Sequence, residues 1–376
     1  MARKTAIVVT TIFEPRFLRG YVDNIRNNGR TDHVELIVIP DRKTPASVLA
    51  ACVEARRGGI NVSCPSLEEQ EQFLRRFPGL ASRIPYDSDN RRNAGFLLAL
   101  DHQAEVIISI DDDNFCLAES DFIGEHAVVG QETEAPVLDS SDGWFNIGTM
   151  LEGAIKAPLF PRGFPYFARF VDREVRVSLP RRQTAAINAG LWIGDPDVDA
   201  VSRLALAPHV DRVATRSYFL GPHTWSPINT QNTAVSRQAM PAYYYTRMGY
   251  PVGGMTIDRY GDILSGYFSQ KCVRARGEYI RIGSPVADHR RTPHNLFKDL
   301  AHELAGMVII EDLLPWLREL SLDGASYAGL YRNLADELAK QADRFTGFLW
   351  DQGAGAFLRE TAANMQAWLD AVADIG

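Results

Sequence analysis

The stretch that most constrains the fold is an apolar run, residues 106–110, that stops on three consecutive aspartates, Asp111, Asp112 and Asp113. A short run rich in Ile and Val predicts a buried strand, so the acids would lie at the carboxyl end of a sheet. Open α/β sheets bind their ligands at that end. Three adjacent carboxylates repel one another unless a cation lies among them, and a divalent cation holding a diphosphate is a common solution. The stretch therefore indicates a metal-dependent nucleotide-sugar enzyme.

The three acids need not share one role. Because side chains alternate along a strand, Asp111 and Asp113 can face one site, while Asp112 points away or bends toward a ribose. The alternative is a solvated acidic turn, since an Asp-x-Asp pattern alone is a weak motif. The position directly after a buried strand favours contact with a metal or nucleotide.

Strands and helices alternate through the first third of the chain. The apolar spacing predicts strands at residues 5–11 and 34–39 and helices at 17–28, 46–57, 66–77 and 92–102, the last leading into the aspartate strand. The helix at residue 66 should begin with a capping box made by Ser66 and Glu69. This alternation is typical of a mostly parallel sheet covered by helices on both faces.

The rest of the chain changes character twice. Residues 116–290 give shorter segments rich in Gly, Pro and aromatics, and we expect a mixed sheet with long functional loops there. From residue 296 the pattern predicts amphipathic helices, interrupted at Pro315 and continuing at 327–345 and 360–374. We therefore expect a catalytic α/β domain over residues 1–295 and a helical C-terminal extension over 296–376. The tryptophans of the extension could form a homo-oligomer surface or pack in the core.

Composition narrows the class of protein. A formal net charge of -7 argues against a nucleic-acid partner, because binding a phosphate backbone requires a concentrated basic face. The four cysteines form no Cys-x-x-Cys pair, which disfavours a structural zinc site or a disulfide scaffold and favours a cytoplasmic protein. The apolar start is cut short at residue 14, too early for a signal peptide, and no apolar stretch is long enough to span a membrane.

Three arginines could meet a diphosphate or a sugar. Arg92 starts the helix before the aspartate strand, where the planar guanidinium and free backbone N–H groups suit a diphosphate. Arg162 and Arg169 lie seven residues apart in an aromatic loop that can shape a sugar pocket. Each also has a plain alternative, because arginines at helix starts are often solvated and aromatic loops are more often packing than pocket.

Further candidates lie in the middle of the chain. A Gly190-Leu191-Trp192 segment precedes a turn that carries Asp197, and an amide-rich turn ends at Asn232; both patterns are also compatible with ordinary turns. Asp262 could face a sugar or cap the helix it begins. His289 is the histidine whose surroundings best suit a manganese-type site, although a surface histidine in a basic loop fits equally well.

In this order, these segments resemble the reversibly glycosylated polypeptides, a family that includes plant UDP-arabinopyranose mutases. The resemblance runs from about residue 5 to residue 320. It covers the strand ending in Asp111-Asp-Asp113, the helix at 92–95, Phe145-Asn146, Arg162-Gly-Phe-Pro with Arg169, Gly190-Leu-Trp, Pro196-Asp-Val-Asp-Ala200, Asn232 and Arg259-Tyr-Gly-Asp262. The ordered set is far more specific than any one of its members.

The resemblance implies a GT-A-like, Rossmann-like mixed sheet flanked by helices, a divalent metal (Mn²⁺ or Mg²⁺), and interconversion of pyranose and furanose forms of a nucleotide sugar. The family links the arginine that aligns with Arg162 to reversible glycosylation, and Arg169 takes a supporting position. The base stays open between a UDP-arabinose-like sugar and a GDP-L-galactose-like or GDP-L-fucose-like sugar. The expected site residues are catalytic Arg162, Arg169 and Asp262; nucleotide-binding Thr10, Asp41, Arg92 and Asp112; sugar-binding Asn146, Gly190, Leu191, Trp192, Asp197 and Asn232; and metal-binding Asp111, Asp113 and His289.

The chemistry leaves two roles open for Arg162. Changing the ring size requires the bond between the anomeric carbon and the diphosphate to open, with negative charge developing on the leaving group. Covalent capture of the sugar by Arg162 would need activation by a carboxylate, because arginine is essentially always protonated, whereas charge stabilisation needs no bond. No Gly-x-Gly-x-x-Gly follows a strand, which argues against a flavin. Two other functions remain: a glycosyltransferase that uses an acceptor, and a non-catalytic nucleotide-sugar carrier.

Overall fold

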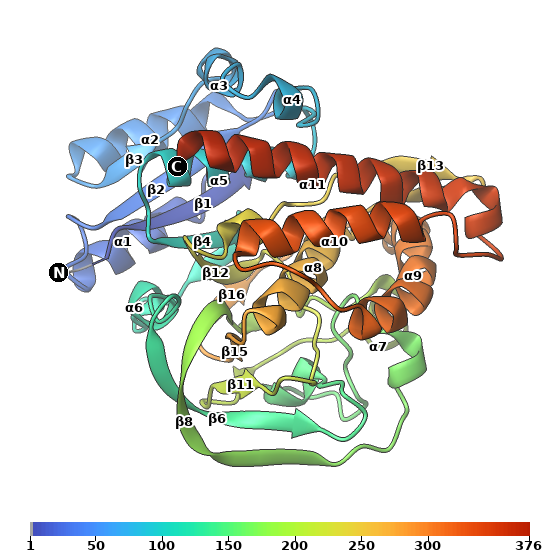
Figure 1. Ribbon diagram of the computed structural model, residues 1–376. Coiled ribbons are helices and arrows are strands. Elements are labelled where there is room, and N and C mark those ends of the chain that lie inside the picture. The colour runs from blue at the N-terminus through green and yellow to red at the C-terminus, as the bar shows by residue number, and fades with distance from the viewer. Residues whose placement is uncertain (1–2) are drawn as a thin grey trace.

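The centre of the molecule is a mixed sheet with helices on both of its faces (Figure 1), in a computed structural model that describes residues 3–376. Its strands in chain order are β1 (Thr5–Thr11), β2 (Val34–Pro40), β3 (Asn61–Ser63), β4 (Val106–Asp111), β6 (Glu132–Ser140), β8 (Val175–Ala189), β11 (Tyr218–Leu220), β12 (Asn232–Ser236) and β15 (Tyr279–Ile282). In space they follow the order β15-β11-β6-β8-β12-β4-β1-β2-β3. The predicted α/β fold with a mixed, helix-flanked sheet is confirmed.

Smaller elements extend this framework. Short sheets join β5 (Asn114–Cys116) and β9 (Trp192–Gly194) to β16 (Ala287–His289), β7 (Leu151–Glu152) to β10 (Arg212–Val213), and β13 (Tyr250–Val252) to β14 (Met255–Ile257). The helices are α1 (Leu18–Asn27), α2 (Ala46–Arg57), α3 (Leu67–Leu74), α4 (Pro78–Ala81), α5 (Arg92–Asp101), α6 (Phe122–His126), α7 (Ala200–Leu206), α8 (Gly261–Ala275), α9 (Leu296–Glu319), α10 (Tyr327–Gln341) and α11 (Gly355–Ile375).

The parallel part of the sheet matches the sequence pattern. β1 pairs in parallel with β2 and β4, and β2 pairs in parallel with β3. Alternate residues of β1 enter different cores: Val8 packs in the cluster that contains α5, and Val9 in the cluster that contains α1 and α2. A strand buried on both faces reads as a continuous apolar run, which is why these strands could be predicted. The capping box of Ser66 and Glu69 is also present.

Beyond β4 the sheet contains antiparallel pairs as well as parallel ones, the latter joining β11 to β6 and β15 to β8. β12 pairs antiparallel with β4 and with β8, and the fifteen-residue β8 also pairs antiparallel with β6. The predicted mixed character of residues 116–290 is therefore confirmed. Because β12 lies beside β4, the segment that leads into β12 comes close to the acids at the end of β4.

The C-terminal helices cover one face of the sheet. Figure 1 shows α11 lying across the sheet beside α10, and both contact the core through buried residues that join the same apolar cluster as α5. The interruption predicted at Pro315 is wrong, because α9 runs through this residue to Glu319. The division of the chain at residue 295 stays an expectation. In the described part of the chain, no helix is long and apolar enough to cross a membrane.

Gly95 sets the distance between α5 and the sheet. A Cβ at this position would lie 2.4 Å from Val8 Cγ1 and 3.0 Å from Ile39 Cγ1. We expect Gly95→Ala to destabilise the protein by about 1–3 kcal/mol through overpacking. Urea unfolding measures this change. Gly79→Ala in α4 is the matched control, since nothing lies within 4 Å of the added Cβ, and it should leave stability unchanged or raise it slightly. Equal effects of the two substitutions would contradict the prediction.

Candidate functional site

Asp111, Asp112 and Asp113 lie at the carboxyl end of β4, as the sequence predicts. Asp111 is the last residue of the strand and pairs in register with Thr10 of β1. Asp112 Oδ2 accepts a hydrogen bond from Thr11 Oγ1 at 2.6 Å. Burial, opposed by Arg92 and reinforced by Asp113, raises the pKa of Asp111 to about 6, and burial likewise raises the pKa of Asp112 to about 6. Neighbouring protein atoms and the other carboxylates thus disfavour the charged forms of Asp111 and Asp112.

Arg92, the first residue of α5, is buried and contacts one of these acids, Asp111. One terminal nitrogen, Nη1, donates to Ser109 Oγ at 2.8 Å and to the Thr230 backbone oxygen at 3.0 Å, and Nη2 donates to Asp111 Oδ1 at 2.6 Å and to Thr10 Oγ1 at 3.2 Å. Both terminal nitrogens are therefore bonded to protein oxygens. Arg92 joins β1, β4 and the chain before β12, and the predicted contact with a diphosphate gains no support from this geometry.

The side chain of His289 lies close to that of Asp113, which belongs to the turn between β4 and β5. His289 ends β16 and places Nε2 3.2 Å from Asp113 Oδ2, while Nδ1 hydrogen-bonds to the backbone oxygen of Asp195. A carbonyl on one ring nitrogen fixes the ring orientation and leaves the other nitrogen facing the acids, the arrangement usual for metal-binding histidines. Asp111 is 38% exposed and Asp113 is 20% exposed, so both carboxylates reach solvent.

The donor set fits a hard divalent cation in its chemistry, since two carboxylates and an imidazole suit manganese. Within residues 3–376, however, no three His, Cys, Asp or Glu side chains are already gathered as a ligand group. Asp111, Asp113 and His289 are therefore candidates that a cation and its diphosphate ligand would draw together.

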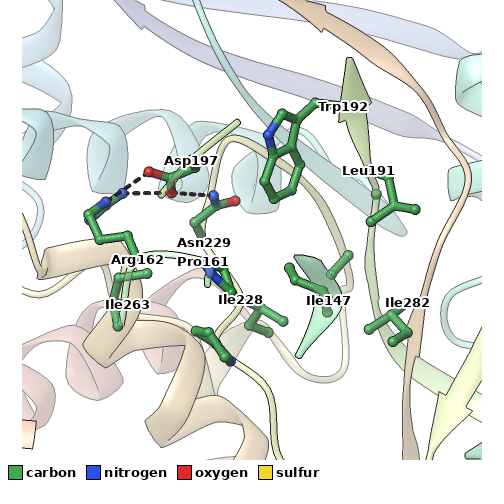
Figure 2. A pocket seen from close by; sticks show the side chains of 13 residues that line it. Ile147, Pro161, Arg162, Leu191, Trp192, Asp197, Ile228, Asn229, Ile263 and Ile282 are labelled. Carbon is green, nitrogen blue, oxygen red and sulfur yellow. Dashed lines mark hydrogen bonds and ion pairs between the residues drawn. The ribbon is translucent and has the colours of Figure 1, made fainter. Parts of the chain in front are cut away.

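Arg162 is enclosed by two carboxylates. Its Nε and Nη2 donate to Asp197 at 3.0 Å each, and Nη1 and Nη2 donate to Asp262 at 2.9 and 2.7 Å. Nη1 also donates to the backbone oxygen of Arg259. All five N–H groups of the guanidinium thus have partners, and Figure 2 shows the bidentate contact with Asp197. The sequence motifs named all three charged side chains, although nothing in their spacing predicted that they pair.

The opposite charges of Arg162, Asp197 and Asp262 determine the pKa shifts within this cluster. Burial alone would lower the pKa of Arg162, but Asp197 and Asp262 outweigh it and raise the pKa well above its ordinary value. Burial would likewise raise the pKa of Asp197, yet Arg162 and the amide of Asn229, which donates at 2.7 Å, hold it below its usual range. Arg162 and Asp197 therefore stay ionised at neutral pH, and one guanidinium between two carboxylates gives the cluster a formal net charge of -1.

Arg169 has a supporting position inside the same loop. It is buried, donates to the Asp199 carboxylate and to the Phe164 backbone oxygen, and lies 3.8 Å from the centroid of the Tyr166 ring. Asp199 in turn caps α7 by accepting from Ser202 N at 2.7 Å. Arg169 therefore fixes the loop that carries Arg162 to the start of α7.

The predicted sugar-binding residues separate into two groups. Gly190, Leu191, Trp192 and Asp197 line a small cavity of about 10 Å³ together with Arg162 (Figure 2). This volume holds about one water molecule, so a sugar requires the surrounding loops to open. Trp192 Nε1 is buried in this wall without a hydrogen-bond partner.

The other predicted ligand residues support the backbone. Asn232 is buried and bonds to His126, the Leu191 oxygen and the Pro285 oxygen. Asn146 accepts from Gly148 N and donates to the Leu159 oxygen, and Asp41 accepts from the backbone N–H of Arg42 and Asp87. Their predicted contacts with sugar or nucleotide gain no support from these bonds. Asn146, Gly148 and Thr149 also line a larger cavity of about 430 Å³, which extends to His209 and Arg212.

Sequence reasoning missed the contribution of α9. Glu303 is buried on this helix, accepts from Arg259 Nε at 3.1 Å and accepts from Ala200 N at 2.7 Å. Arg259 adopts a φ of 56°, a left-handed conformation that is uncommon for residues other than glycine. Glu303 thus holds the strained residue whose oxygen contacts Arg162. An acid within an amphipathic helix carries no signal of this role.

The fold and site together describe an α/β protein with strand-end acids and an arginine enclosed by carboxylates. The chain belongs to the reversibly glycosylated polypeptide family, whose model matches residues 18–376, so the resemblance read from the motifs is confirmed.

Among curated relatives, a probable UDP-arabinopyranose mutase 4 of Arabidopsis thaliana is 28% identical over 253 residues, covering 65% of this chain and 62% of the relative. A probable UDP-arabinopyranose mutase 1 of Pisum sativum is 27% identical, covering 69% of this chain and 67% of the relative. The chain thus matches less than two thirds of the length of the first of them.

Among solved structures, a mannosyltransferase from Pyrobaculum calidifontis in complex with GDP-Man and Mn²⁺ has a TM-score of 0.40 and 14% identity, covering 99% of this chain and 86% of that one. A glucosyl-3-phosphoglycerate synthase from Mycobacterium tuberculosis in complex with Mn²⁺ and UDP-Glc has a TM-score of 0.38 and 13% identity, covering 82% and 79%. The family assignment rests on the sequence match.

Proposed function

We propose that this protein interconverts the pyranose and furanose forms of a nucleotide sugar, with UDP-arabinopyranose as the first candidate substrate. The observation that carries the proposal is the enclosure of Arg162 by Asp197 and Asp262 beside the strand-end acids. The family match and the names of its plant relatives support the same reaction.

The charge of the Arg162 cluster suits the first step. When the bond between the anomeric carbon and the diphosphate opens, positive charge develops on the sugar. The net charge of -1 on Arg162, Asp197 and Asp262 stabilises that charge, and the guanidinium keeps both carboxylates in place at no cost of reorganisation. Covalent capture by Arg162 would instead require it to release a proton, for which the two carboxylates are the neighbouring acceptors.

The strand-end acids would serve the other half of the substrate. Asp111, Asp113 and His289 would hold a divalent cation, Mn²⁺ or Mg²⁺, that neutralises the diphosphate as it departs. Arg92 fixes Asp111 and Thr10 in position from below. Asp112, which accepts a hydrogen bond from Thr11, would contact the ribose.

The decisive experiment uses the purified protein, UDP-arabinopyranose and Mn²⁺ without any acceptor. We expect the furanose form to appear and reach equilibrium, followed by chromatography or NMR. The same assay with GDP-L-galactose and GDP-L-fucose identifies the base. The proposal is wrong if no furanose forms from any of these sugars; transfer that requires an added acceptor would then indicate a glycosyltransferase, and binding without turnover a carrier.

Removing the metal should stop turnover. We expect a chelator to abolish furanose formation and added Mn²⁺ to restore it. Asp113→Asn should raise the Mn²⁺ concentration needed for half-maximal rate by about 10-fold or more, because it replaces an anionic donor with a neutral one. Asp288→Asn is the matched control, since Asp288 lies in the same strand as His289 but its carboxylate binds Arg290. Turnover that is insensitive to the chelator would contradict the role assigned to these residues.

A further inference from the structure

Ring contraction moves a proton, whatever its mechanism. In the pyranose form O4 carries a hydrogen and O5 lies in the ring, whereas in the furanose form O5 carries the hydrogen and O4 lies in the ring. A group that accepts a proton from O4 and returns it to O5 is therefore needed beside the sugar. This requirement rests on the proposed function and is independent of how the anomeric carbon is held.

Most carboxylates around Arg162 are already engaged. Asp197 and Asp262 both bind Arg162 in a bidentate manner. The remaining acids also have partners: Asp111 binds Arg92, Asp112 binds Thr11, Asp113 lies against His289, Asp258 binds His302, Asp299 binds Arg291, and Glu303 binds Arg259. A carboxylate locked in such a pair is poorly suited to exchanging a proton with substrate.

Asp89 is different. It begins the short helical turn η1 (Asp89–Arg91) before α5, its side chain is exposed, and among residues 3–376 no hydrogen bond or ion pair engages its carboxylate. The turn nevertheless lies at the site, because Tyr245, whose backbone oxygen accepts a hydrogen bond from Asn90, packs its ring against Gly261, the residue before Asp262.

The neighbours of Asp89 hold it in place. Asn90 and Asn93, on either side of Arg92, both donate to the backbone oxygen of Tyr245, at 2.7 and 2.9 Å. Ser88 Oγ accepts from Asn90 N at 3.3 Å and starts the turn. A free carboxylate on a fixed turn is the arrangement that proton transfer requires, because the donor and acceptor must be positioned before the reaction.

We propose that Asp89 carries the proton from O4 to O5. After the bond between the anomeric carbon and the diphosphate oxygen breaks, O4 bonds to that carbon and its proton passes to the Asp89 carboxylate. The bond between the anomeric carbon and O5 then breaks, and O5 takes the proton back from Asp89. The diphosphate oxygen re-forms its bond to the anomeric carbon, so that Asp89 and the nucleotide end as they began.

Isotope exchange separates this step from bond cleavage. UDP-arabinopyranose labelled with ¹⁸O between the anomeric carbon and the diphosphate loses the label from that position when the bond opens and closes again, which ³¹P NMR detects. For Asp89→Asn we expect exchange to continue while furanose formation falls by about 100-fold or more. Asp87→Asn is the matched control on the same turn, because Asp87 pairs with Lys43 at 3.2 Å instead of facing the site, and it should keep both activities.

The other possible results would overturn either the role of Asp89 or the proposed function. Unchanged furanose formation in Asp89→Asn overturns the proposal, and so does an equal loss of exchange and furanose formation, which would place Asp89 in binding or bond cleavage. A lower melting temperature of Asp89→Asn than of Asp87→Asn, with activity lost in both reactions, would show a structural role and also overturn it. A wild-type protein that performs neither reaction disproves the proposed function itself.

Discussion

Replacing Arg162 with Lys should lower turnover by about 100-fold to 1,000-fold, the cost usual for losing a preorganised charge contact in an active site. Lysine keeps the charge but offers one ammonium group in place of the planar fork, so it cannot bind Asp197 and Asp262 in a bidentate manner together. Steady-state assay of furanose formation measures the loss. We expect kcat to fall more than KM rises, because the cluster acts on the charge that develops during the reaction.

Two controls sharpen this prediction. Arg176→Lys changes an exposed arginine whose partner, Glu174, is also exposed, and it should have no effect. Asp197→Asn keeps the size of the side chain but makes the Arg162 cluster neutral, and it should also lower kcat. A normal rate in Asp197→Asn would show that the net negative charge of the cluster is unimportant.

The second large effect is expected on stability. Asp199→Ala should lower the free energy of unfolding by about 3–5 kcal/mol, because it leaves Arg169 charged and unpaired inside the protein. It also removes the cap of α7. Urea unfolding measures the change. Asp199→Asn keeps a capping oxygen and should cost less.

An exposed acid of the same region provides the control. Asp211 lies 3.9 Å from His209 with both side chains largely exposed, and Asp211→Ala should change stability by less than about 0.5 kcal/mol. Similar losses in Asp199→Ala and Asp211→Ala would mean that the Arg169 pair contributes nothing beyond an ordinary surface contact.

The parts of the fold that sequence predicted are those with a local cause. β1, β2 and β4 are apolar runs buried on both faces, and α3 begins at a capping box made within four residues. The position of the acids at the end of β4 followed from the same run. The interruption expected at Pro315 failed because proline lacks only one helical hydrogen bond there, and packing of α9 against the core outweighs that loss.

The roles of polar side chains depended on contacts far apart in the chain. Arg92 suits a diphosphate by its chemistry, but Thr230 approaches it from 138 residues away and occupies its donors. Asn232 is held in the same way by His126, 106 residues distant. Motif spacing contains no information about such partners. The pairing of Arg162 with Asp262, 100 residues apart, was equally invisible until the fold brought them together.

The contact of Glu303 with Arg259 joins the stability of the C-terminal helices to the order of Arg162. Glu303 holds both the start of α7 and the strained residue whose oxygen completes the partners of Arg162. Local opening of α9 would therefore release both supports in one cooperative event. Amide protection along the first turns of α9 and the fraction of molecules with an ordered Arg162 should rise and fall together, which makes the distant helix part of the thermodynamic unit that defines the site.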